Sequence, residues 1–374
     1  MQKVYTADEV FTGVECLPNH AVITNGDIIE NVLPIISLPK NLKISGHSFF
    51  LAPAFLDLQI YGADKKLLAV YPSADTLEVM YQHCLRGGTH HFMPTVATNT
   101  NEVFYKSIDA VKSYWKAGGK GVLGLHVEGP WINKIKRGAH IETLIHSPDI
   151  KEVSDLLEYG KGVIKIITLA PEVCSKPVIE LIKSHGMLIS AGHSNATFTE
   201  AMQAFDGGIR AATHLFNAMS SFHHRDAGMP GAVMQCETVM ASIIADGHHV
   251  DFDVIKIAKK IIQNRLYLIT DAVTETTEGY YLHHLDGDKY TSNGILSGSA
   301  ITMLQSVKNC ISKVGIELNE ALRMASLYPA KVAGIDHNFG RIQKGYAASF
   351  VMLDKNLDII PEEIFESEKQ GFKV

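Results

Sequence analysis

The central part of the chain alternates between short apolar runs and segments with helical periodicity. The runs are continuously apolar, which is typical of strands buried on both faces of a parallel sheet. One helical segment places Ala300, Met303, Leu304, Val307, Cys310 and Ile311 on a single face. The apolar runs include residues 51–60, 122–127, 163–169, 187–191, 239–245 and 266–270.

This alternation predicts an α/β fold, most simply a (β/α)8 TIM barrel. A doubly wound parallel sheet is the main alternative, but no G-x-G-x-x-G sequence follows the first strand, which disfavours it. The chain ends differ from the middle. Short alternating stretches near the start are broken by the turn sequence Asn25-Gly26-Asp27, and the apolar run 347–353 lies near the end. Both ends are therefore predicted to form strands.

Polar side chains follow directly where several of the apolar runs stop. Glu128, His193, His214 and Asp271 each occupy such a position. In a barrel, the carboxyl ends of all strands converge on one face, where active sites lie. A carboxylate and two histidines can hold a metal ion and leave one coordination position open, so we choose Glu128, His193 and His214 as ligands. Asp271 can accept a proton from water and return it to a leaving nitrogen.

Each of these residues has a simpler interpretation when it is taken alone, because a Glu or His at a strand end usually caps an element or completes a hydrogen bond. Recurrence at successive strand ends is what favours a site. The remaining histidines are weaker candidates. His126 is predicted to be an interior histidine with satisfied hydrogen bonds, and His283-His284 to be solvated in a hairpin. His90-His91 precedes a strand, at the end remote from catalysis.

Composition narrows the class of partners. The 374 residues carry a net charge of −6 with acids and bases mixed, so nothing indicates a nucleic-acid or membrane surface. No apolar run approaches the roughly 18–20 residues that span a bilayer, and the first residues lack the apolar core of a secretory signal. The five cysteines are dispersed without a C-x-x-C pair. This favours a cytoplasmic protein with reduced thiols.

Seven short segments follow one another in a specific order: GLHVEGPW at 124–131, KRGAH at 136–140, SAGHSNAT at 190–197, ATHLFNAM at 212–219, IADGHHVD at 244–251, LITDA at 268–272 and LSGS at 296–299. Each is weak evidence alone. As an ordered set they resemble the N-acetylglucosamine-6-phosphate deacetylases of the amidohydrolase superfamily. The resemblance extends over essentially the whole chain.

The resemblance implies a fold and a cofactor. The fold is a (β/α)8 barrel over residues 52–335 with a small β-sandwich domain built from both chain ends, residues 1–51 and 336–374. The cofactor is one divalent metal ion per subunit. Zinc suits the donor set, and iron, cobalt and manganese also remain open. The implied metal ligands are again Glu128, His193 and His214.

The resemblance also implies the reaction and the residues that bind the substrate. Asp271 would act as catalytic acid and base while His140 polarises the acetyl carbonyl, so that acetate and glucosamine 6-phosphate are released. Arg225 and His249 would neutralise the phosphate. In this family such an arginine can come from a neighbouring subunit, so a homodimer is expected. The other expected substrate contacts are Ala139, Asn217, Ala218, Leu296, Ser297 and Gly298.

The chain departs from the family pattern in two places. Many amidohydrolases carry H-x-H at the end of the first barrel strand and bind a second metal there. Here Gln59 and Tyr61 replace those histidines, so one metal ion is predicted, and Tyr61 is less usual than the asparagine found in some relatives. Ala54 stands where glycine is common, which we interpret as a packing change.

Other functions remain as alternatives. The same chemistry on a galactosamine-type sugar phosphate differs only in one hydroxyl of the substrate. Dihydroorotases and deaminases usually use the missing H-x-H pair or a carbamylated lysine, whereas Glu128 occupies the ligand position here. A non-catalytic sugar-phosphate-binding barrel is the alternative from another class. Such relatives typically lose metal ligands or the aspartate, and all four residues are present in this chain.

Overall fold

The larger part of the molecule is a barrel, as predicted. The computed structural model describes residues 2–361. Its main sheet has eight parallel strands whose spatial order follows the sequence. The sheet closes on itself, because a parallel bridge joins Ile60 to Ala272 and the Asp271 N–H donates to the Gln59 carbonyl at 2.9 Å. The strands are β5 (Phe55–Ile60), β8 (Thr89–Ala97), β9 (Leu125–Glu128), β10 (Ile164–Leu169), β11 (Leu188–Ala191), β12 (Ala211–Ala212), β13 (Met240–Ile243) and β14 (Leu266–Leu268).

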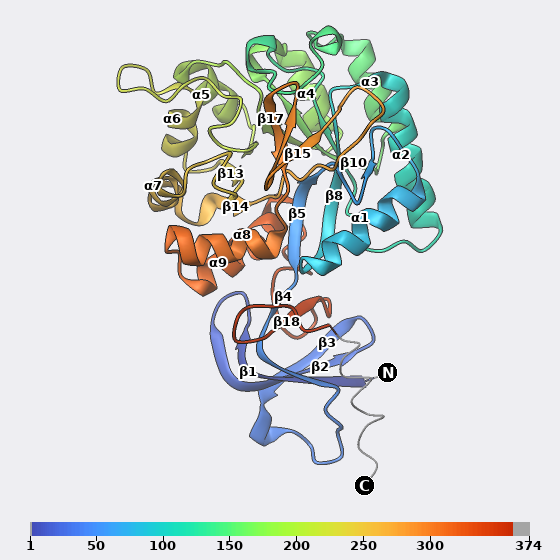
Figure 1. The fold of residues 1–374 in the computed structure, drawn as a ribbon, viewed down its shortest axis with the longest axis vertical. Helices are drawn as coiled ribbons and strands as arrows, with labels where there is room; N and C mark the ends of the chain where they lie inside the picture. The colour runs from blue at the N-terminus through green and yellow to red at the C-terminus, as the bar shows by residue number, and fades with distance from the viewer. Residues whose placement is uncertain (1, 362–374) are drawn as a thin grey trace.

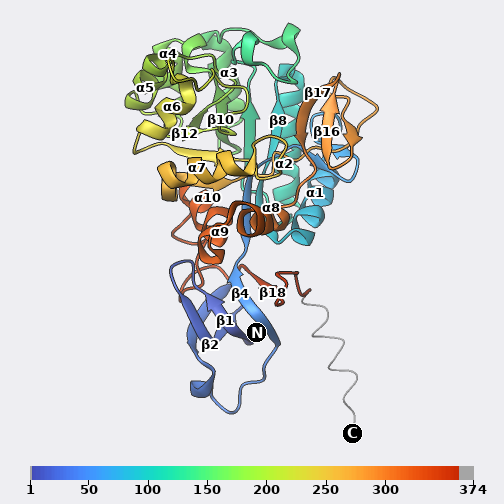
Figure 2. The same cartoon turned by 60° about the vertical axis from the view of Figure 1, so that its left-hand side comes forward.

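Helices follow the strands along the chain and cover the outside of the barrel (Figures 1 and 2). Ser73, Thr100 and Thr197 each cap a helix by accepting a hydrogen bond from an N–H of its first turn. The helices are α1 (Ala74–Arg86), α2 (Asn101–Lys116), α3 (Ile150–Tyr159), α4 (Lys176–Ser184), α5 (Phe198–Asp206), α6 (Gly228–Gln235), α7 (Phe252–Ile262), α8 (Met303–Asn309), α9 (Leu318–Ala325) and α10 (Leu327–Val332). No helix within residues 2–361 has the length and apolar character needed to cross a membrane.

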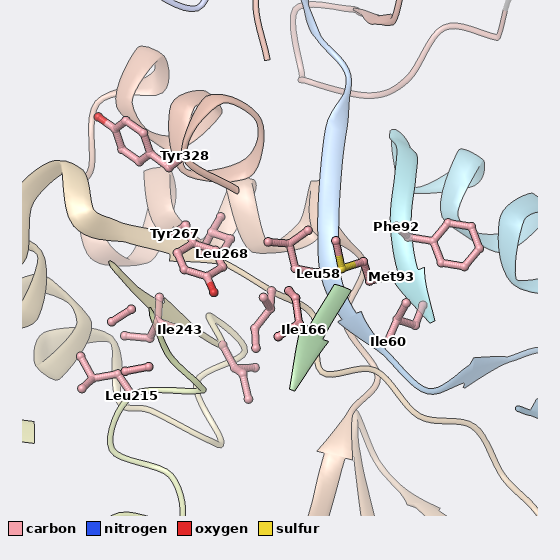
Figure 3. Close-up of a cluster of buried hydrophobic side chains, with 14 of the residues drawn as sticks. Leu58, Ile60, Phe92, Met93, Ile166, Leu215, Ile243, Tyr267, Leu268 and Tyr328 are labelled. Carbon is pink, nitrogen blue, oxygen red and sulfur yellow. The ribbon is translucent and has the colours of Figure 1, made fainter. Parts of the chain in front are cut away.

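Burial on both faces explains why the barrel strands are continuously apolar. In Figure 3 the neighbouring residues Phe92 and Met93 of β8 point in opposite directions. Phe92 packs outward, where its ring stacks on Tyr81 of α1 at 6.5 Å between centroids. Thr95 and Ala97, which follow Met93 on the inward face, line a cavity at the top of the barrel. One strand therefore supplies both the packing against helices and part of the site.

A second sheet joins the two chain ends at the bottom of the barrel (Figure 1). It has five strands in the order β18-β4-β1-β2-β3. The predicted turn at Gly26, with φ 58°, connects β2 to β3. The predicted small β domain from both chain ends is confirmed, although residues 362–374 of it lie outside the described residues. Its strands are β1 (Gln2–Phe11), β2 (Cys16–Asn25), β3 (Ile28–Pro34), β4 (Gly46–Pro53) and β18 (Phe350–Leu353).

Two elements differ from the sequence-based expectation. The apolar run 51–60 is divided between two sheets, since β4 ends at Pro53 and β5 begins at Phe55. Ala54 is buried at this junction, so hydrophobicity does not mark the change of sheet. The helical segment expected from Ala300 begins only at Met303, and its last turn, Cys310–Val314, is π-helical.

A small three-stranded sheet lies over the top of the barrel (Figures 1 and 2). It follows β14 along the chain, and Ser299 at its end donates through its N–H to the Asp271 carbonyl at 3.0 Å. This sheet therefore forms part of the wall above the strand ends. Its strands are β15 (His284–Asp286), β16 (Lys289–Ser292) and β17 (Ile295–Ser299).

Candidate metal centre and active site

A cavity of about 820 Å³, partly open to solvent, lies at the carboxyl ends of the barrel strands. Arg225 is the one predicted site residue that does not line it, because Arg225 is exposed in the loop before α6. The other predicted residues come together there from many separate strands and loops. They are Glu128, Ala139, His140, His193, His214, Asn217, Ala218, His249, Asp271, Leu296, Ser297 and Gly298.

Three buried ligand atoms form a triangle that fits a metal ion. Glu128 Oε1 lies 3.4 Å from His193 Nε2 and 3.3 Å from His214 Nε2, and the two Nε2 atoms are 3.0 Å apart. A tetrahedral zinc ion with bonds of about 2.0–2.1 Å would need ligand atoms about 3.4 Å apart. The spacing and donor types therefore fit one divalent ion.

Backbone carbonyls orient both histidines of this triangle. His193 Nδ1 lies 2.9 Å from the Lys136 carbonyl, and His214 Nδ1 lies 3.2 Å from the Asn217 carbonyl. A carbonyl can only accept, so each Nδ1 carries the hydrogen and each Nε2 keeps its lone pair for a metal. The loop that follows β12 thus holds His214 and places Asn217 beside it.

His140 is a fourth side chain that can reach a metal at this centre. Glu128, His140 and His193 also form a group with ligand atoms close enough to share an ion. However, His140 Nε2 faces the other carboxylate oxygen, Glu128 Oε2, at 3.3 Å. Because Oε1 is the atom shared by His193 and His214, the triangle with His214 is the better ligand set. His140 then lies beside this triangle, on the other oxygen of Glu128.

The backbone at three of these strand ends is in the left-handed region. His193, His214 and Asp271 have φ values of 47°, 37° and 54°. This conformation is uncommon for residues other than glycine and costs on the order of 1–3 kcal/mol each. Its recurrence at three strand ends indicates that the fold holds these side chains in place against their own backbone preference.

Burial and mutual charge set the ionisation of the centre. Burial alone would raise the pKa of Glu128, but His193, His140 and His214 outweigh it and hold that pKa well below its usual range. Burial, with the neighbouring His140, lowers the pKa of His193 to about 4. Burial raises the pKa of Asp271, and the negative charge of Glu128 adds to this effect. An anionic carboxylate and a neutral imidazole are the forms that bind metal.

His249 enters the cavity from the loop after β13. Its Nδ1 lies 2.6 Å from the Asp246 carboxylate, and the two side chains are only 7% and 4% exposed. This contact fixes the ring, with Asp246 on its Nδ1 side. His249 is therefore a fixed polar group that lines the cavity.

His283 was wrongly predicted to be solvated. It is 4% exposed and lines the cavity, with Nδ1 2.9 Å from Ser297 Oγ. Tyr281 also lines the cavity, and its hydroxyl donates to the Thr98 carbonyl at 2.7 Å. Periodicity cannot reveal either residue, because their burial depends on the small sheet folding back over the barrel. His284, by contrast, is exposed as predicted.

The predictions for two other histidines are confirmed. His126 is buried inside the barrel, where it contacts the Leu58 carbonyl at 3.0 Å and Thr168 Oγ1 at 2.8 Å. His91 lies at the opposite end of the barrel from the cavity and contacts Ser349 Oγ at 3.0 Å. Neither side chain contributes to the centre.

Comparison with known protein families agrees with this geometry. Residues 50–374 match the amidohydrolase family, a family of metal-dependent hydrolases, and residues 5–45 match the NagA composite domain. The chain therefore belongs to the amidohydrolase family.

Individual relatives narrow the class further. An N-acetylglucosamine-6-phosphate deacetylase of Haemophilus influenzae is 34% identical, covering 94% of this chain and 95% of that protein. An N-acetylgalactosamine-6-phosphate deacetylase of Escherichia coli is 29% identical, covering 96% and 97%. The crystal structure of N-acetylglucosamine-6-phosphate deacetylase from Pasteurella multocida has a TM-score of 0.90 at 33% identity, covering 96% and 97%. The predicted resemblance to these deacetylases is confirmed.

Proposed function

We propose that this chain removes the acetyl group from N-acetylglucosamine 6-phosphate and releases glucosamine 6-phosphate and acetate. The observation that carries the proposal is that Asp271 and the metal-sized triangle of ligand atoms face one cavity. The relatives from Haemophilus influenzae and Pasteurella multocida support the choice of substrate. N-acetylgalactosamine 6-phosphate is the second candidate, supported by the Escherichia coli relative.

Glu128, His193 and His214 would hold one divalent metal ion. We propose zinc, because one carboxylate and two imidazoles suit it, although iron, cobalt and manganese accept the same donors. When bound, the ion supplies the Lewis acidity that activates water and polarises the acetyl carbonyl. The oriented Nε2 atoms of the two histidines support this ligand set.

Asp271 would carry the proton through the reaction. Its carboxylate takes a proton from the attacking water and gives it to the amide nitrogen as the C–N bond breaks. The sugar then leaves as the amine and the acetyl group as acetate. His140, with Nδ1 2.7 Å from Thr98 Oγ1, would donate from Nε2 to the carbonyl oxygen as negative charge develops there.

The phosphate would be bound by His249, Asn217 and Ala218, which line the cavity. Arg225 would complete this subsite from a second copy of the chain, so we propose a homodimer. The exposure of Arg225 in its own chain supports a role in a neighbouring subunit. The remaining substrate contacts would come from Ala139, Leu296, Ser297 and Gly298.

Two further assignments accompany this function. We propose that residues 52–335 form the catalytic domain and that residues 1–51 and 336–374 form the small β domain, which the separate sheet at the chain ends supports. We also propose a cytoplasmic location. Its support is that all five cysteines are free thiols, as is usual in a reducing compartment.

Metal removal and reconstitution test the proposed function. The purified chain is dialysed against a chelator, and acetate and glucosamine 6-phosphate are quantified before and after one equivalent of zinc is restored. We expect equal amounts of both products, loss of turnover without metal, and recovery on reconstitution. Undiminished turnover in verified metal-free protein would contradict the proposal.

A further inference from the structure

Tyr61 contacts both acidic residues of the centre. Its hydroxyl donates to Glu128 Oε2 and lies 3.2 Å from Asp271 Oδ1. Gln59 Nε2 lies 2.9 Å from Glu128 Oε1 and 2.7 Å from the same Asp271 oxygen. Gln59 Nε2 also lies 2.7 Å from the Tyr61 hydroxyl oxygen. The single phenol hydrogen therefore points to Glu128, at the end of β9, while the amide hydrogens of Gln59 link Tyr61 to Asp271, which follows β14.

The backbone holds Tyr61 and Asp271 in a fixed relation. Gln59 and Tyr61 alternate along one strand edge and so point into the barrel together. The Asp271 N–H donates to the Gln59 carbonyl and the Tyr61 N–H donates to the Ala272 carbonyl, both at 2.9 Å. The Tyr61 ring also packs beside Leu67, Ala97 and Tyr281. Its hydroxyl is thus held by contacts on both strands that close the barrel.

The Tyr61 hydroxyl contacts the oxygen of Glu128 that lies away from the two proposed histidine ligands. Tyr61 and His140 contact Oε2, whereas Oε1 lies 3.4 Å from His193 Nε2 and 3.3 Å from His214 Nε2. A carboxylate that is free to rotate could present either oxygen or both. With Oε2 bound to a neutral donor, Glu128 offers a single oxygen to the ligand triangle.

We propose that Tyr61 is a positioning residue: it holds Glu128 Oε2, is tied to Asp271 through Gln59, and leaves Glu128 Oε1 as the single carboxylate ligand atom of the centre. Gln59 completes this tie from the same strand. The inference rests on the proposed function for the identity of the metal site, but it concerns how the site is organised. A neutral phenol and a neutral amide together can join the two carboxylates without adding a cation between them.

The test is the Tyr61→Phe variant, which keeps the ring and its packing and removes only the hydroxyl. Tyr328→Phe is the matched control, because Tyr328 also donates to a carboxylate, Glu320 at 3.0 Å, but on the outer helices. Each protein is stripped of metal, and its affinity for zinc is measured by competition with a chelator in the absence of substrate. Steady-state kinetics on N-acetylglucosamine 6-phosphate follow with the reloaded proteins.

We expect Tyr61→Phe to bind zinc between about 10- and 100-fold more weakly, as loss of a hydrogen bond to a ligand typically does. At saturating zinc, kcat falls about tenfold or more because Gln59 loses the hydroxyl that orients its amide toward Asp271, while KM stays within about twofold. Tyr328→Phe leaves both quantities at wild-type values. Wild-type zinc affinity and wild-type kcat in Tyr61→Phe would overturn the proposal, even if that variant melts at a lower temperature.

This design distinguishes failure of the proposed function from failure of the role proposed for Tyr61. If the wild type binds zinc but releases no acetate, the proposed function fails, and the zinc affinity of Tyr61→Phe still decides the role of Tyr61. If Tyr61→Phe does not fold, Gln59→Met removes the other half of the tie. Unchanged zinc affinity in Gln59→Met would then overturn the proposal, and a comparable weakening would support it.

Discussion

Asp271 differs from its neighbours because the proposed chemistry uses it for proton transfer and not for binding metal. Asp271→Asn keeps the size of the side chain and removes the base, so we expect kcat to fall by about 10²–10⁴. Metal content measured on the same sample stays near that of the wild type. Asp206→Asn, exposed on α5, is the control and keeps full activity. Normal turnover by Asp271→Asn would refute the assigned role.

At the residue scale, the sequence predicted that the members of the proposed centre come together, because they lie at strand ends. Glu128, His193, His214 and Asp271 each follow an apolar strand, and barrel geometry brings such positions together. The sequence could not identify His283, whose burial comes from a small sheet that folds over the cavity. Nor could it assign Tyr61, because only the packed strands show that its hydroxyl lies between two carboxylates.

At the scale of elements, the segment after β10 supports the loop that carries His193. Glu172 accepts hydrogen bonds from the Asn195 N–H and the Ser194 hydroxyl, both at 2.7 Å, and from Asn133 Nδ2 at 3.0 Å. Sequence alone places Glu172 at a strand end, like the metal ligands. The structure gives it a different task, because its carboxylate is occupied by this loop.

Glu172→Ala tests that support. The hydrogen-bond donors that Glu172 accepts from would lose their partner, which lowers the free energy of unfolding by about 1–3 kcal/mol. We also expect zinc affinity to fall, because the loop that carries His193 is no longer held in place. Glu180→Ala on α4 is the matched control, since its exposed pairing with Lys183 contributes little. Chemical denaturation and chelator competition measure the two effects. Equal stability and zinc affinity in the Glu172 and Glu180 variants would show that the loop does not depend on Glu172.

The contact between β5 and the segment after β14 predicts a pH dependence of stability. Burial raises the pKa of Asp57 to about 7, although hydrogen bonds from Thr270 and Gln59 oppose the shift. The folded state therefore keeps a proton that the unfolded chain loses above about pH 4. Protonated Asp57 therefore adds to the free energy of unfolding at low pH, and this contribution is lost as the pH rises through about 7.

Asp57→Asn carries no titrating group, so comparison with it isolates this effect. We expect the stability of the wild type relative to Asp57→Asn to fall between pH 4.5 and pH 8 by on the order of a few kcal/mol. Urea denaturation of both proteins at the two pH values provides the measurement. A stability difference that is independent of pH would mean that Asp57 is ionised in the folded chain throughout.

The sequence predicted the end of a strand or helix only where the pattern of polar and apolar residues changes at that point. The hairpin turn at Gly26 was found because its residues favour that turn. The division of the run 51–60 between two sheets was not found, because Ala54 is as buried as the strands on either side. The separate small sheet at the chain ends was predictable from its alternating pattern, since its strands do not need helices on both faces.

At the scale of the whole molecule, the exposed position of Arg225 predicts shared active sites. Arg225→Ala raises KM for the phosphorylated sugar by about 10-fold or more, through loss of a charge-assisted contact. Mixing Arg225→Ala with Asp271→Asn under conditions of subunit exchange restores activity, because one mixed site then combines Asp271 with an intact arginine. Acetate release by the mixture provides the measurement. A mixture no more active than its components would place Arg225 in its own subunit's site.

The central claim is that the cavity selects an N-acetylated amino-sugar phosphate. The most direct measurement is kcat/KM for acetate release by metal-quantified protein on N-acetylglucosamine 6-phosphate, N-acetylgalactosamine 6-phosphate and unphosphorylated N-acetylglucosamine. We predict the highest value for N-acetylglucosamine 6-phosphate and a value for the unphosphorylated sugar lower by about 10²-fold or more, which corresponds to roughly 2.7 kcal/mol of lost phosphate binding. No acetate from any of the three sugars, with metal bound, would contradict the account.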